Sequence, residues 1–396
     1  MTDFLREAQD LLPQMVRWRR DFHRHPELGF QEVRTAGIVA QHLHDLGLEV
    51  TQGIGRTGVV AVLEGTRPGP TVMLRFDMDA LPISEANQTD YVSQTPGVMH
   101  ACGHDGHTAI GLGVSTLLAR HRAELAGRVK FVFQPAEEGL GGALAMINDG
   151  ALESPRPDIA FGLHLWNTLP VGRAIAQAGH LMAASDKFIL RVHGRGGHGA
   201  LPHETIDAVV VGAQLVIALQ TIVSRNVDPT QTAVLTIGRF QAGQVYNVIA
   251  ETAELVGGFR SFNESVRQTM IERVEAVTKG IAGTFGATGE VEWLPIAPPL
   301  VNDERATAHI AAVAKDILGA ENVTGSGPLM VSEDMAEFLN RVLGCFFFIG
   351  SMNEERGLKY PHHNPRFDFD ESAMPLGLAI MCEATARILR KAGQDT

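Results

Sequence analysis

Short apolar runs that are typical of buried strands alternate with helical stretches along this chain. The strand-like runs lie at 71–76, 129–133 and 158–161, and the helical stretches at 35–46, 108–121 and 142–149. Strands that are buried on both faces have continuous apolar sequences, and helices between them allow parallel neighbours. The alternation therefore predicts an α/β fold with a mostly parallel sheet and helices on both of its faces.

The middle of the chain has a different order of elements. Strand, helix, strand, strand, helix and strand are expected at 187–193, 205–223, 232–240, 252–260, 263–285 and 291–295. This βαββαβ order is that of a ferredoxin-like unit. The α/β pattern then resumes, with helices at 303–318 and 371–391 and a strand at 345–349. We expect an inserted domain over 186–298 and a discontinuous domain formed by 1–185 and 299–396.

Composition excludes several classes of partner. A chain of 396 residues, 45% of them hydrophobic, is long enough for two domains. A net charge of −12 without a Lys/Arg-rich run argues against nucleic acid or an anionic membrane as a partner. The most apolar window, 209–219, is too short to cross a bilayer, and acidic residues in 1–20 argue against a signal peptide. Three cysteines are typical of a reducing compartment, so we expect a cytoplasmic enzyme.

Residues of metal-binding type occur in clusters that are far apart in the sequence. The clusters are Cys102 with His104, Glu138 with His164, and His362 with His363. Glu138 and His164 each follow a predicted strand, and ligands of open α/β sheets bind beyond the carboxyl ends of the strands. Thiolate, imidazole and carboxylate ligands together are typical of a hydrolytic zinc- or manganese-class centre. The clusters thus predict a metallohydrolase.

Further carboxylates accompany these clusters. Glu137 and Glu138 are adjacent, so on an extended backbone their side chains point in opposite directions. One can then bind metal while the other acts on the attacking water. Asp77 and Asp79 end another predicted strand and serve either as ligands or as carboxylates that orient metal-bound imidazoles.

Cys102 allows two other interpretations. It is either a buried thiol beside a capping histidine or a nucleophile activated by His104 or His107. The other clusters favour a metal ligand over both. A protein that binds metal or an amino acid without catalysis is a third alternative, and Glu137, which no metal requires, argues against it.

Other polar residues have weaker signals. His23 and His25 lie where Pro26 ends a helix, which already explains them. His198 lies in a glycine-rich turn that lacks the spacing of a nucleotide fingerprint. Asn247 and Arg260 interrupt apolar β sequence, and Arg260 either binds a substrate carboxylate or caps a strand edge.

Seven segments together resemble one enzyme family. They are RRDFHRHPELGFQE, LRFDMDALPISE, MHACGHDGHTA, QPAEEGLGGA, GLHLW, HGRGGHGALPH and HHNPRFDFDE. In this order, from Arg19 to Gly377, they are similar to the M20 metallopeptidase family. The most similar branch contains hippurate hydrolases, N-acyl-amino-acid amidohydrolases, N-acetyldiaminopimelate deacetylases and auxin-conjugate hydrolases.

The resemblance implies a role for each candidate residue. It implies two divalent metal ions (Zn, Mn, Co or Ni) with ligands Cys102, His104, Glu138, His164 and His363. His363 is preferred to His362 because it begins the family's His-x-x-x-Phe pattern. The catalytic residues implied are Glu137 and, for the oxyanion, His198 of the inserted lid domain. Asn247 and Arg260 are the implied substrate-binding residues, which together would hold the free carboxylate of the amino-acid part.

The implied activity is hydrolysis of the amide bond of a small N-acyl amino acid, such as a benzoyl or acetyl derivative. N-acetyldiaminopimelate or a small peptide is the alternative substrate. The lid also implies a homodimer or homotetramer. Ala250, where many relatives have proline, and Gly258, where threonine is common, depart from the family pattern, so the acyl and amino-acid preference stays open.

Overall fold

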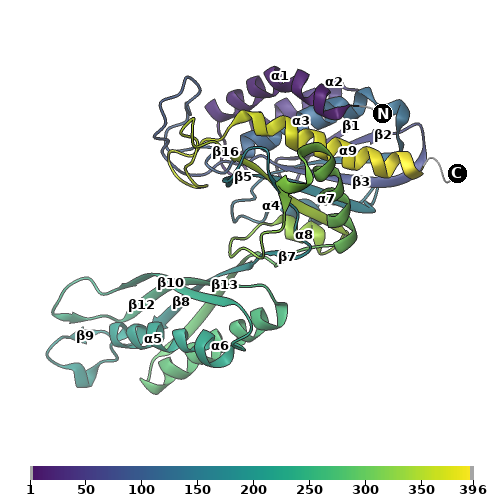
Figure 1. The fold of residues 1–396 in the computed structure, drawn as a ribbon. Helices are drawn as coiled ribbons and strands as arrows, with labels where there is room; N and C mark the ends of the chain where they lie inside the picture. Colours follow the sequence, from purple (N-terminus) through teal and green to yellow (C-terminus); the bar gives the residue numbers. More distant parts are fainter. Residues whose placement is uncertain (1–2, 393–396) are drawn as a thin grey trace. The chain divides into compact units, whose positions relative to one another are not determined.

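An eight-stranded sheet is the largest element of the computed structural model, which describes residues 3–392 (Figure 1). Its strands, in spatial order, are β1 (Glu49–Ile54), β2 (Gly58–Glu64), β4 (Ala126–Gln134), β3 (Arg67–Asp77), β5 (Ile159–Pro170), β16 (Gly344–Met352), β6 (Ala174–Ile175) and β15 (Val323–Thr324). The central strands β4, β3, β5 and β16 run parallel to one another, and β1 and β2 are antiparallel. The expected α/β class with a mostly parallel sheet is confirmed.

Seven helices of the described chain accompany this sheet. They are α1 (Phe4–Arg24), α2 (Val33–Asp45), α3 (His104–Arg120), α4 (Gly142–Asn148), α7 (Glu304–Leu318), α8 (Met335–Leu339) and α9 (Met374–Ala392). Helices α1, α3 and α9 pack against one another. Helix α3 is buried from its first residue, and a Cβ atom on Gly111 would lie 2.6 Å from the ring of Phe133 in β4. Glycine therefore lets α3 lie directly on the sheet, which fixes the helix end that carries His104.

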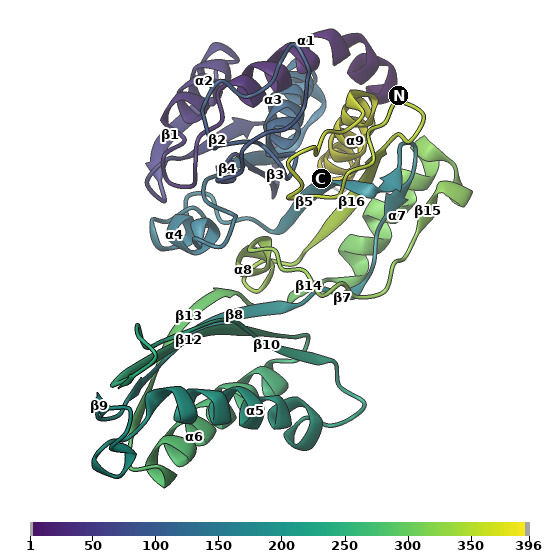
Figure 2. The same cartoon turned by 90° about the vertical axis from the view of Figure 1, so that its left-hand side faces the viewer.

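The second sheet is four-stranded and antiparallel, in the order β10-β12-β8-β13. Its elements follow the chain as β8 (Ala184–His193), α5 (Ala208–Asn226), β10 (Ala233–Ala242), β12 (Thr252–Ser261), α6 (Glu264–Thr284) and β13 (Thr288–Ala297). This is the predicted βαββαβ order. Figure 2 shows α5 and α6 together on one face of the sheet, where Leu190, Leu215, Leu255 and Met270 form part of a buried core. A small additional sheet pairs β9 (Gly197–His198) with β11 (Val248–Ile249).

Contacts within the chain divide it into two compact units. Unit 1 comprises Met1–Leu181, Val301–Gly327 and Asp334–Thr396, and unit 2 comprises Met182–Leu300 and Pro328–Glu333. Two short strands, β7 (Gly179–Met182) and β14 (Leu300–Asn302), lie at the boundaries. Four 3-10 turns complete the elements: η1 (Arg122–Glu124), η2 (Pro202–Glu204), η3 (Ala320–Asn322) and η4 (Glu371–Ala373).

Polar caps explain where three long helices begin. The side chains of Asp207, Asn263 and Asp303 accept hydrogen bonds from the first backbone N–H groups of α5, α6 and α7. Those N–H groups have no partner inside the helix, and each such cap stabilises a helix by about 1 kcal/mol. The caps fix the helix starts at Ala208, Glu264 and Glu304, close to the positions that the sequence predicts.

Two helical segments are long and apolar enough to cross a membrane by length and composition. They are Ala208–Asn226 and Glu371–Arg390, with 33% and 78% of their most apolar windows buried inside the structure. The second is thus a core helix of unit 1. The first packs one side on the sheet of unit 2 and leaves Val209, Val210 and Ile217 exposed. The apolar segment is therefore longer than the window expected from the sequence.

Strand β5 also differs from its prediction. The apolar run suggested a strand that ends before His164, but β5 continues to Pro170. The extension pairs with β16, where Phe348 lies opposite His164 and Met352 opposite Pro170. His164 therefore projects from within a strand and not from the loop after it.

Candidate metal centre

Cys102 lies in the loop before helix α3. Gly103, with φ at 94°, ends this loop in a left-handed conformation that glycine adopts without strain, and His104 begins the helix. The Sγ atom of Cys102 lies 3.4 Å from Nε2 of His164 on β5. Cys102, His104 and His164 each offer a ligand atom within 4.8 Å of the others. The loop, the helix end and the strand thus meet at one buried point.

The ring of His104 is oriented by Asp79. Nδ1 of His104 donates to the backbone oxygen of Asp79 at 2.9 Å and lies 3.1 Å from its Oδ1. Because a carbonyl oxygen only accepts, Nδ1 holds the hydrogen; Nε2 is buried without a hydrogen-bond partner in the described structure. Burial disfavours charge on this ring, but Asp77, Asp79 and Glu138 outweigh it and raise the pKa of His104 to about 10. The surroundings therefore stabilise a cation at Nε2.

His164 is held in the opposite protonation state. Its Nδ1 donates to the backbone oxygen of Leu165 at 2.7 Å, so Nε2 has a free lone pair. Burial, together with nearby His107 and His362, holds the pKa of His164 well below its usual value. A neutral imidazole fixed by a hydrogen bond from its second nitrogen is the usual form of a metal-binding histidine.

Glu137 and Glu138 lie in a turn, so the expectation of an extended backbone is wrong. The turn begins at Ala136, which has φ at 55° and donates its N–H to Glu32 Oε1 at 2.9 Å. The N–H of Glu138 donates to Asp79 Oδ2 at 3.0 Å. Two buried carboxylates thus hold the strained backbone, and both glutamates lie on the same side as His104, with ligand atoms within 4.8 Å of it.

The two C-terminal histidines differ in their contacts. His363 has φ at 65°, and its Nε2 lies 3.3 Å from Glu138 Oε1, an atom that is buried without a hydrogen bond. Nε2 of His362 instead donates to the backbone oxygen of Leu165 at 2.9 Å. Of the two rings, the structure brings His363 to the other candidate ligands.

The candidate ligands lie in a set of donor atoms of the kind that binds metal ions. Three overlapping groups have ligand atoms within 4.8 Å: Cys102–His104–His164, Cys102–Glu138–His363 and His104–Glu137–Glu138. Burial and the charges of Glu138, Glu137 and Asp77 raise the pKa of Cys102 well above its usual value, so the thiolate needs a cation to form. His104 Nε2 and Glu138 Oε1, two buried atoms without a hydrogen bond in the described part of the chain, point to the same requirement.

Asp77 and His107 support this centre without free ligand atoms. Asp77 Oδ1 accepts from His107 Nδ1 at 2.6 Å, and its Oδ2 accepts from Arg75 at 2.6 Å. Nε2 of His107 accepts from the N–H of Leu165 at 2.9 Å. Because both ring nitrogens of His107 are occupied, this histidine is not available to activate Cys102 as a nucleophile.

His23 is a buried structural residue. Its ring nitrogens bind Asp105 Oδ2 at 2.8 Å and Glu85 Oε1 at 3.1 Å, and Arg19 binds the same Asp105 oxygen. Helix α1 ends at Arg24, as expected before Pro26. His23 therefore has more contacts than helix termination explains, but they are to the protein interior.

In unit 2, His198 and Asn247 lie side by side. His198 pairs with Val248, and the backbone oxygen of Asn247 accepts from the N–H of Gly199 at 2.9 Å. Nδ1 of His198 accepts from the N–H of Ala200 at 3.0 Å, so the hydrogen of the neutral ring is on Nε2. The exposed ring thus presents a hydrogen-bond donor.

Arg260 is distant from this pair, contrary to the expectation that Asn247 and Arg260 hold one carboxylate together. Arg260 lies near the end of β12, opposite Ser185 of β8. Thr252 is at the start of β12, opposite His193, and it follows β11 closely in the sequence. Eight residues of strand separate Thr252 from Arg260, which is about 26 Å at ~3.3 Å per residue. Half-buried Arg260 has a buried Nη1 without a hydrogen-bond partner in the described structure.

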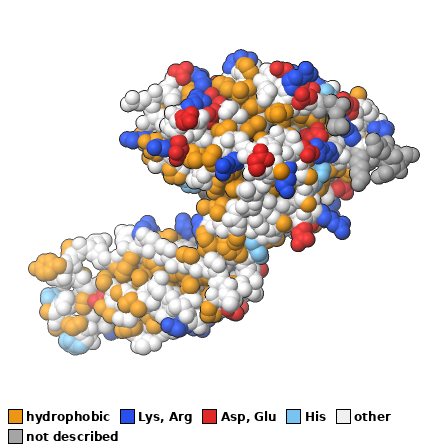
Figure 3. Space-filling model, viewed as in Figure 1, with side chains coloured by type: hydrophobic (Ala, Val, Ile, Leu, Met, Phe, Trp, Pro, Cys, Tyr) orange, Lys and Arg blue, Asp and Glu red, His pale blue; other side chains and the backbone are white. Residues whose placement is uncertain are grey.

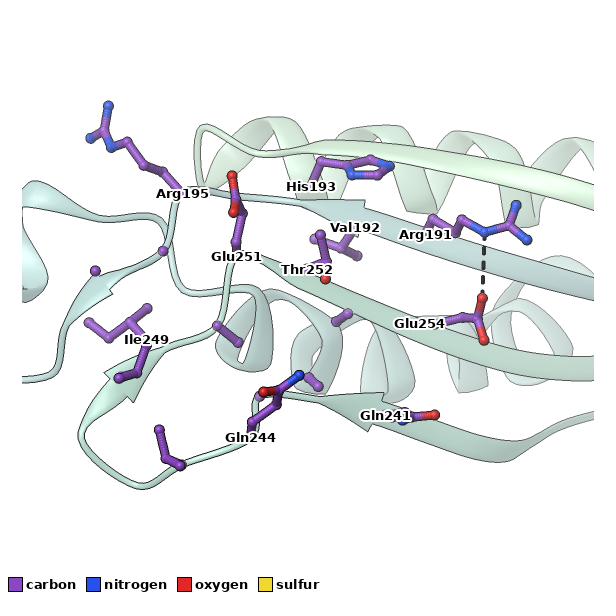
Figure 4. A pocket seen from close by; sticks show the side chains of 18 residues that line it. Arg191, Val192, His193, Arg195, Gln241, Gln244, Ile249, Glu251, Thr252 and Glu254 are labelled. Carbon is purple, nitrogen blue, oxygen red and sulfur yellow. Dashed lines mark ion pairs between the residues drawn. The ribbon is translucent and has the colours of Figure 1, made fainter.

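A groove of about 980 Å³ lies between the β9–β11 pair and the adjoining strand ends (Figure 4). It is lined by Gly197, Val248, Arg195 and Glu251, among others. Figure 4 also shows Arg191 paired with Glu254 at 3.5 Å. The groove lies next to His198, because its lining includes the neighbouring residue Gly197.

Two residues near the centre have no counterpart among the sequence predictions. Glu32 binds the backbone of Ala136, and Asp334 donates its N–H to Glu137 Oε1 at 3.4 Å. Glu32 directly precedes α2 and Asp334 directly precedes the five-residue helix α8. Neither helix start has a motif that indicates a distant partner, so the sequence offered no signal for them.

Comparison with known proteins identifies the family. The model of peptidase family M20/M25/M40 matches residues 73–387. The chain belongs to this family. The M20 protein is 46% identical over 372 residues to a Bacillus subtilis protein named as an amidohydrolase, YhaA, covering 94% of this chain and 93% of the relative. It is 38% identical over 376 residues to the N-acetyl-L-cysteine deacetylase of B. subtilis, covering 95% and 88%.

A solved structure agrees with this assignment. The B. subtilis YxeP protein, described as a dinuclear metal-binding peptidase of the M20 family, superposes with a TM-score of 0.80 at 33% identity, covering 96% of this chain and 99% of that one. The M20 protein is therefore a metal-dependent hydrolase of the amidohydrolase or deacetylase type. The resemblance expected from the sequence is confirmed.

Proposed function

We propose that this M20 amidohydrolase cleaves the amide bond of N-acyl amino acids, with a benzoyl, acetyl or similar acyl group, to a carboxylate and a free amino acid. The observation that carries the proposal is the position of Glu137. Its carboxylate lies beside the candidate ligands His104 and Glu138, but it belongs to neither of the two groups of ligand atoms that contain Cys102. The relative named as an N-acetyl-L-cysteine deacetylase supports this substrate class.

Cys102, His104, Glu138, His164 and His363 would hold two divalent ions, chosen among Zn, Mn, Co and Ni. When bound, the ions supply Lewis acidity and lower the pKa of a water molecule toward neutrality. Glu137 takes a proton from the attacking water and gives it to the nitrogen of the leaving amine as the C–N bond breaks. One proton of the water is thus carried to the amine by Glu137, and the acyl group is released as a carboxylic acid. The proton of this acid passes to the free amine, so the products are a carboxylate and an ammonium group.

Residues of unit 2 would recognise the substrate. The Nε2–H of His198 donates to the oxyanion of the tetrahedral intermediate. Arg260, whose buried Nη1 lacks a partner, binds the carboxylate of the amino-acid part. Asn247, beside His198, contacts the acyl side of the substrate. Unit 2 would thus act as a lid.

The separation within unit 2 supports a role for a second copy of the chain. A small N-acyl amino acid cannot contact both ends of a strand that spans about 26 Å. We therefore propose that Arg260 of one site and His198 with Asn247 of the same site come from different chains of a homodimer or homotetramer. Exposed Val209, Val210 and Ile217 of α5 offer an apolar surface for association, and Figure 3 shows hydrophobic side chains gathered over this unit.

The experiment that tests the proposal is a panel of N-acyl amino acids assayed after the metal is stripped and each candidate ion is restored. N-acetyldiaminopimelate and small dipeptides belong in the panel as alternative substrates. We expect Glu137→Gln to lower kcat by about 100-fold or more while two metals remain bound, and Glu49→Gln, an exposed control, to have no effect.

Three outcomes would contradict the proposal. Parental activity of Glu137→Gln would exclude this residue as the base. Activity that persists after complete metal removal would favour Cys102 as a nucleophile. Absence of turnover on every substrate despite two bound metals would support a non-catalytic binding protein.

A further inference from the structure

Asp334 connects the two ends of the loop that carries Glu137. Its Oδ1 accepts from Gln134 Nε2 at 2.6 Å, and Gln134 is the last residue of β4 before the loop. Its Oδ2 accepts from the N–H of Ala143 at 2.9 Å, in the first turn of α4 after the loop. One buried carboxylate thus holds the residues on either side of Glu137 and Glu138.

The same residue contacts Glu137 through its backbone. The N–H of Asp334 donates to Oε1 of Glu137 at 3.4 Å. A carboxylate that accepts a hydrogen bond from a fixed N–H has a defined rotamer. The side chain of Asp334 therefore sets the position of the donor that orients Glu137.

A buried arginine fixes Asp334 in turn. Arg75 donates from Nη2 to Asp334 Oδ1 at 3.2 Å, from Nε to Gln134 Oε1 at 2.8 Å and from Nη1 to Asp77 Oδ2 at 2.6 Å. Both Arg75 and Asp334 are nearly inaccessible to solvent. Charge-assisted hydrogen bonds in such a dry site are strong and geometrically demanding. Because Asp77 also binds His107, the network joins the Glu137 loop to the helix that begins with His104.

We propose that Asp334 is a positioning residue that holds Glu137 in the geometry for proton transfer. The inference rests on the proposed function, since it assigns Asp334 a part only if Glu137 is the base. An asparagine at 334 has an NH₂ group, a donor, in place of one acceptor oxygen. This NH₂ group would point either at the N–H of Ala143 or at the N–H groups of Gln134 and Arg75, which are themselves donors. The loop that carries Glu137 would therefore shift, although its own sequence is unchanged.

The test compares Asp334→Asn and Asp334→Glu with the parent and with Glu337→Gln. Glu337 is the matched control because it is an acidic residue of the same short helix whose partner is Arg341. We expect both Asp334 variants to lose about 10- to 100-fold in kcat, within the contribution of a positioned acid–base group. KM, the two bound metals and the structure should be retained, and the control should behave as the parent.

A second readout separates positioning from general support of the fold. An amine must be protonated before it leaves, whereas an alkoxide depends less on a positioned proton donor. We therefore expect the kcat loss to be larger for an N-acyl amino acid than for its O-acyl hydroxy-acid counterpart, for example benzoyl-glycine against O-benzoylglycolate. An equal loss for amide and ester would overturn the inference.

Other outcomes also decide the matter. A folded Asp334 variant with parental kcat overturns the inference, and so does loss of the fold in both variants, because Asp334 would then support the domain and not Glu137. If Glu137→Gln is inactive while the Asp334 variants are fully active, only this inference fails. If Glu137→Gln is active, the proposed function fails first.

Discussion

Asp79 binds both the imidazole of His104 and the backbone of Glu138 with the two oxygens of one carboxylate. Oδ1 lies 3.1 Å from Nδ1 of His104, and Oδ2 accepts from the N–H of Glu138 at 3.0 Å. Both oxygens are engaged by the protein, which favours the orienting role among the two roles that the sequence left open for Asp79. It orients two candidate ligands that come from different elements.

We predict that Asp79→Asn weakens metal binding by about 10- to 100-fold, as is common when an outer partner of a ligand is lost. The new amide group would direct a donor at either the N–H of Glu138 or the Nδ1–H of His104, which both already donate. Competition with a fluorescent chelator measures the effect. Asp45→Asn, on the exposed end of α2, is the control, and an unchanged affinity would contradict the assignment.

Replacement of Cys102 separates a ligand from a nucleophile. We predict that Cys102→Ser lowers metal affinity by about 100-fold or more, because loss of a ligand exceeds loss of its outer partner. Elemental analysis of the dialysed protein measures this. Cys345→Ser, at a buried cysteine whose thiol donates to the backbone oxygen of Phe346, should keep both ions. A Cys102→Ser protein with full metal content and no activity would instead favour the thiol mechanism.

Acid should destabilise the protein partly through His100. Its two ring nitrogens are buried without hydrogen-bond partners in the described structure, and burial lowers its pKa to about 4, against the opposing charge of Asp105. Between pH 6.5 and 4 the unfolded chain binds a proton that the folded chain does not. The free energy of unfolding should therefore decrease as the pH is lowered from 6.5 to 4, and His100 contributes about 3 kcal/mol to this decrease.

We predict that His100→Phe removes most of this acid sensitivity and does not destabilise the protein at pH 7, since a similar apolar ring has no unsatisfied polar atoms. Urea unfolding at several pH values, with exposed His44→Phe as the control, measures both effects. A parental pH dependence in His100→Phe would show that other groups dominate.

Mixed dimers test the origin of the lid residues. If Arg260 and His198 of one site come from different chains, a dimer of Arg260→Ala with His198→Ala has one intact site and about half of the parental activity. Each variant alone should be inactive. A dimer of the parent with a chain that carries both substitutions should be inactive as well. If all residues of a site come from one chain, the dimer of the two single variants should be inactive. The dimer of the parent with the doubly substituted chain should then keep about half of the parental activity.

Local pattern was sufficient for the order of the elements but not for their ends. The apolar runs predicted β3, β4 and β5 and the βαββαβ unit. The extension of β5 beyond His164 depends on pairing with β16, almost 200 residues later, which no local window contains. The separation of Asn247 from Arg260, by contrast, follows from the predicted strand at 252–260, since Asn247 precedes this strand and Arg260 lies at its far end.

The candidate site was predictable where residue type alone limits the chemistry. Cysteine, histidine and glutamate at Cys102, His104 and Glu138 have few common roles together. The turn at Ala136 was not predictable, because alanine rarely has a positive φ and the carboxylate of Glu32 that stabilises it lies about 100 residues earlier in the chain. Asp334 lies before a helix of five residues, which is too short for a periodic pattern.

The interruption of unit 1 by unit 2 has a consequence during protein synthesis. The proposed ligand His363 is translated 199 residues after His164, with all of unit 2 in between. At ~5–20 residues per second, a ribosome needs about 10–40 s for this stretch. For that time the nascent chain has four of its five proposed ligands, including a thiol, so an ion captured early would have to be held by an incomplete site. Loading of both ions after release of the chain avoids this exposure.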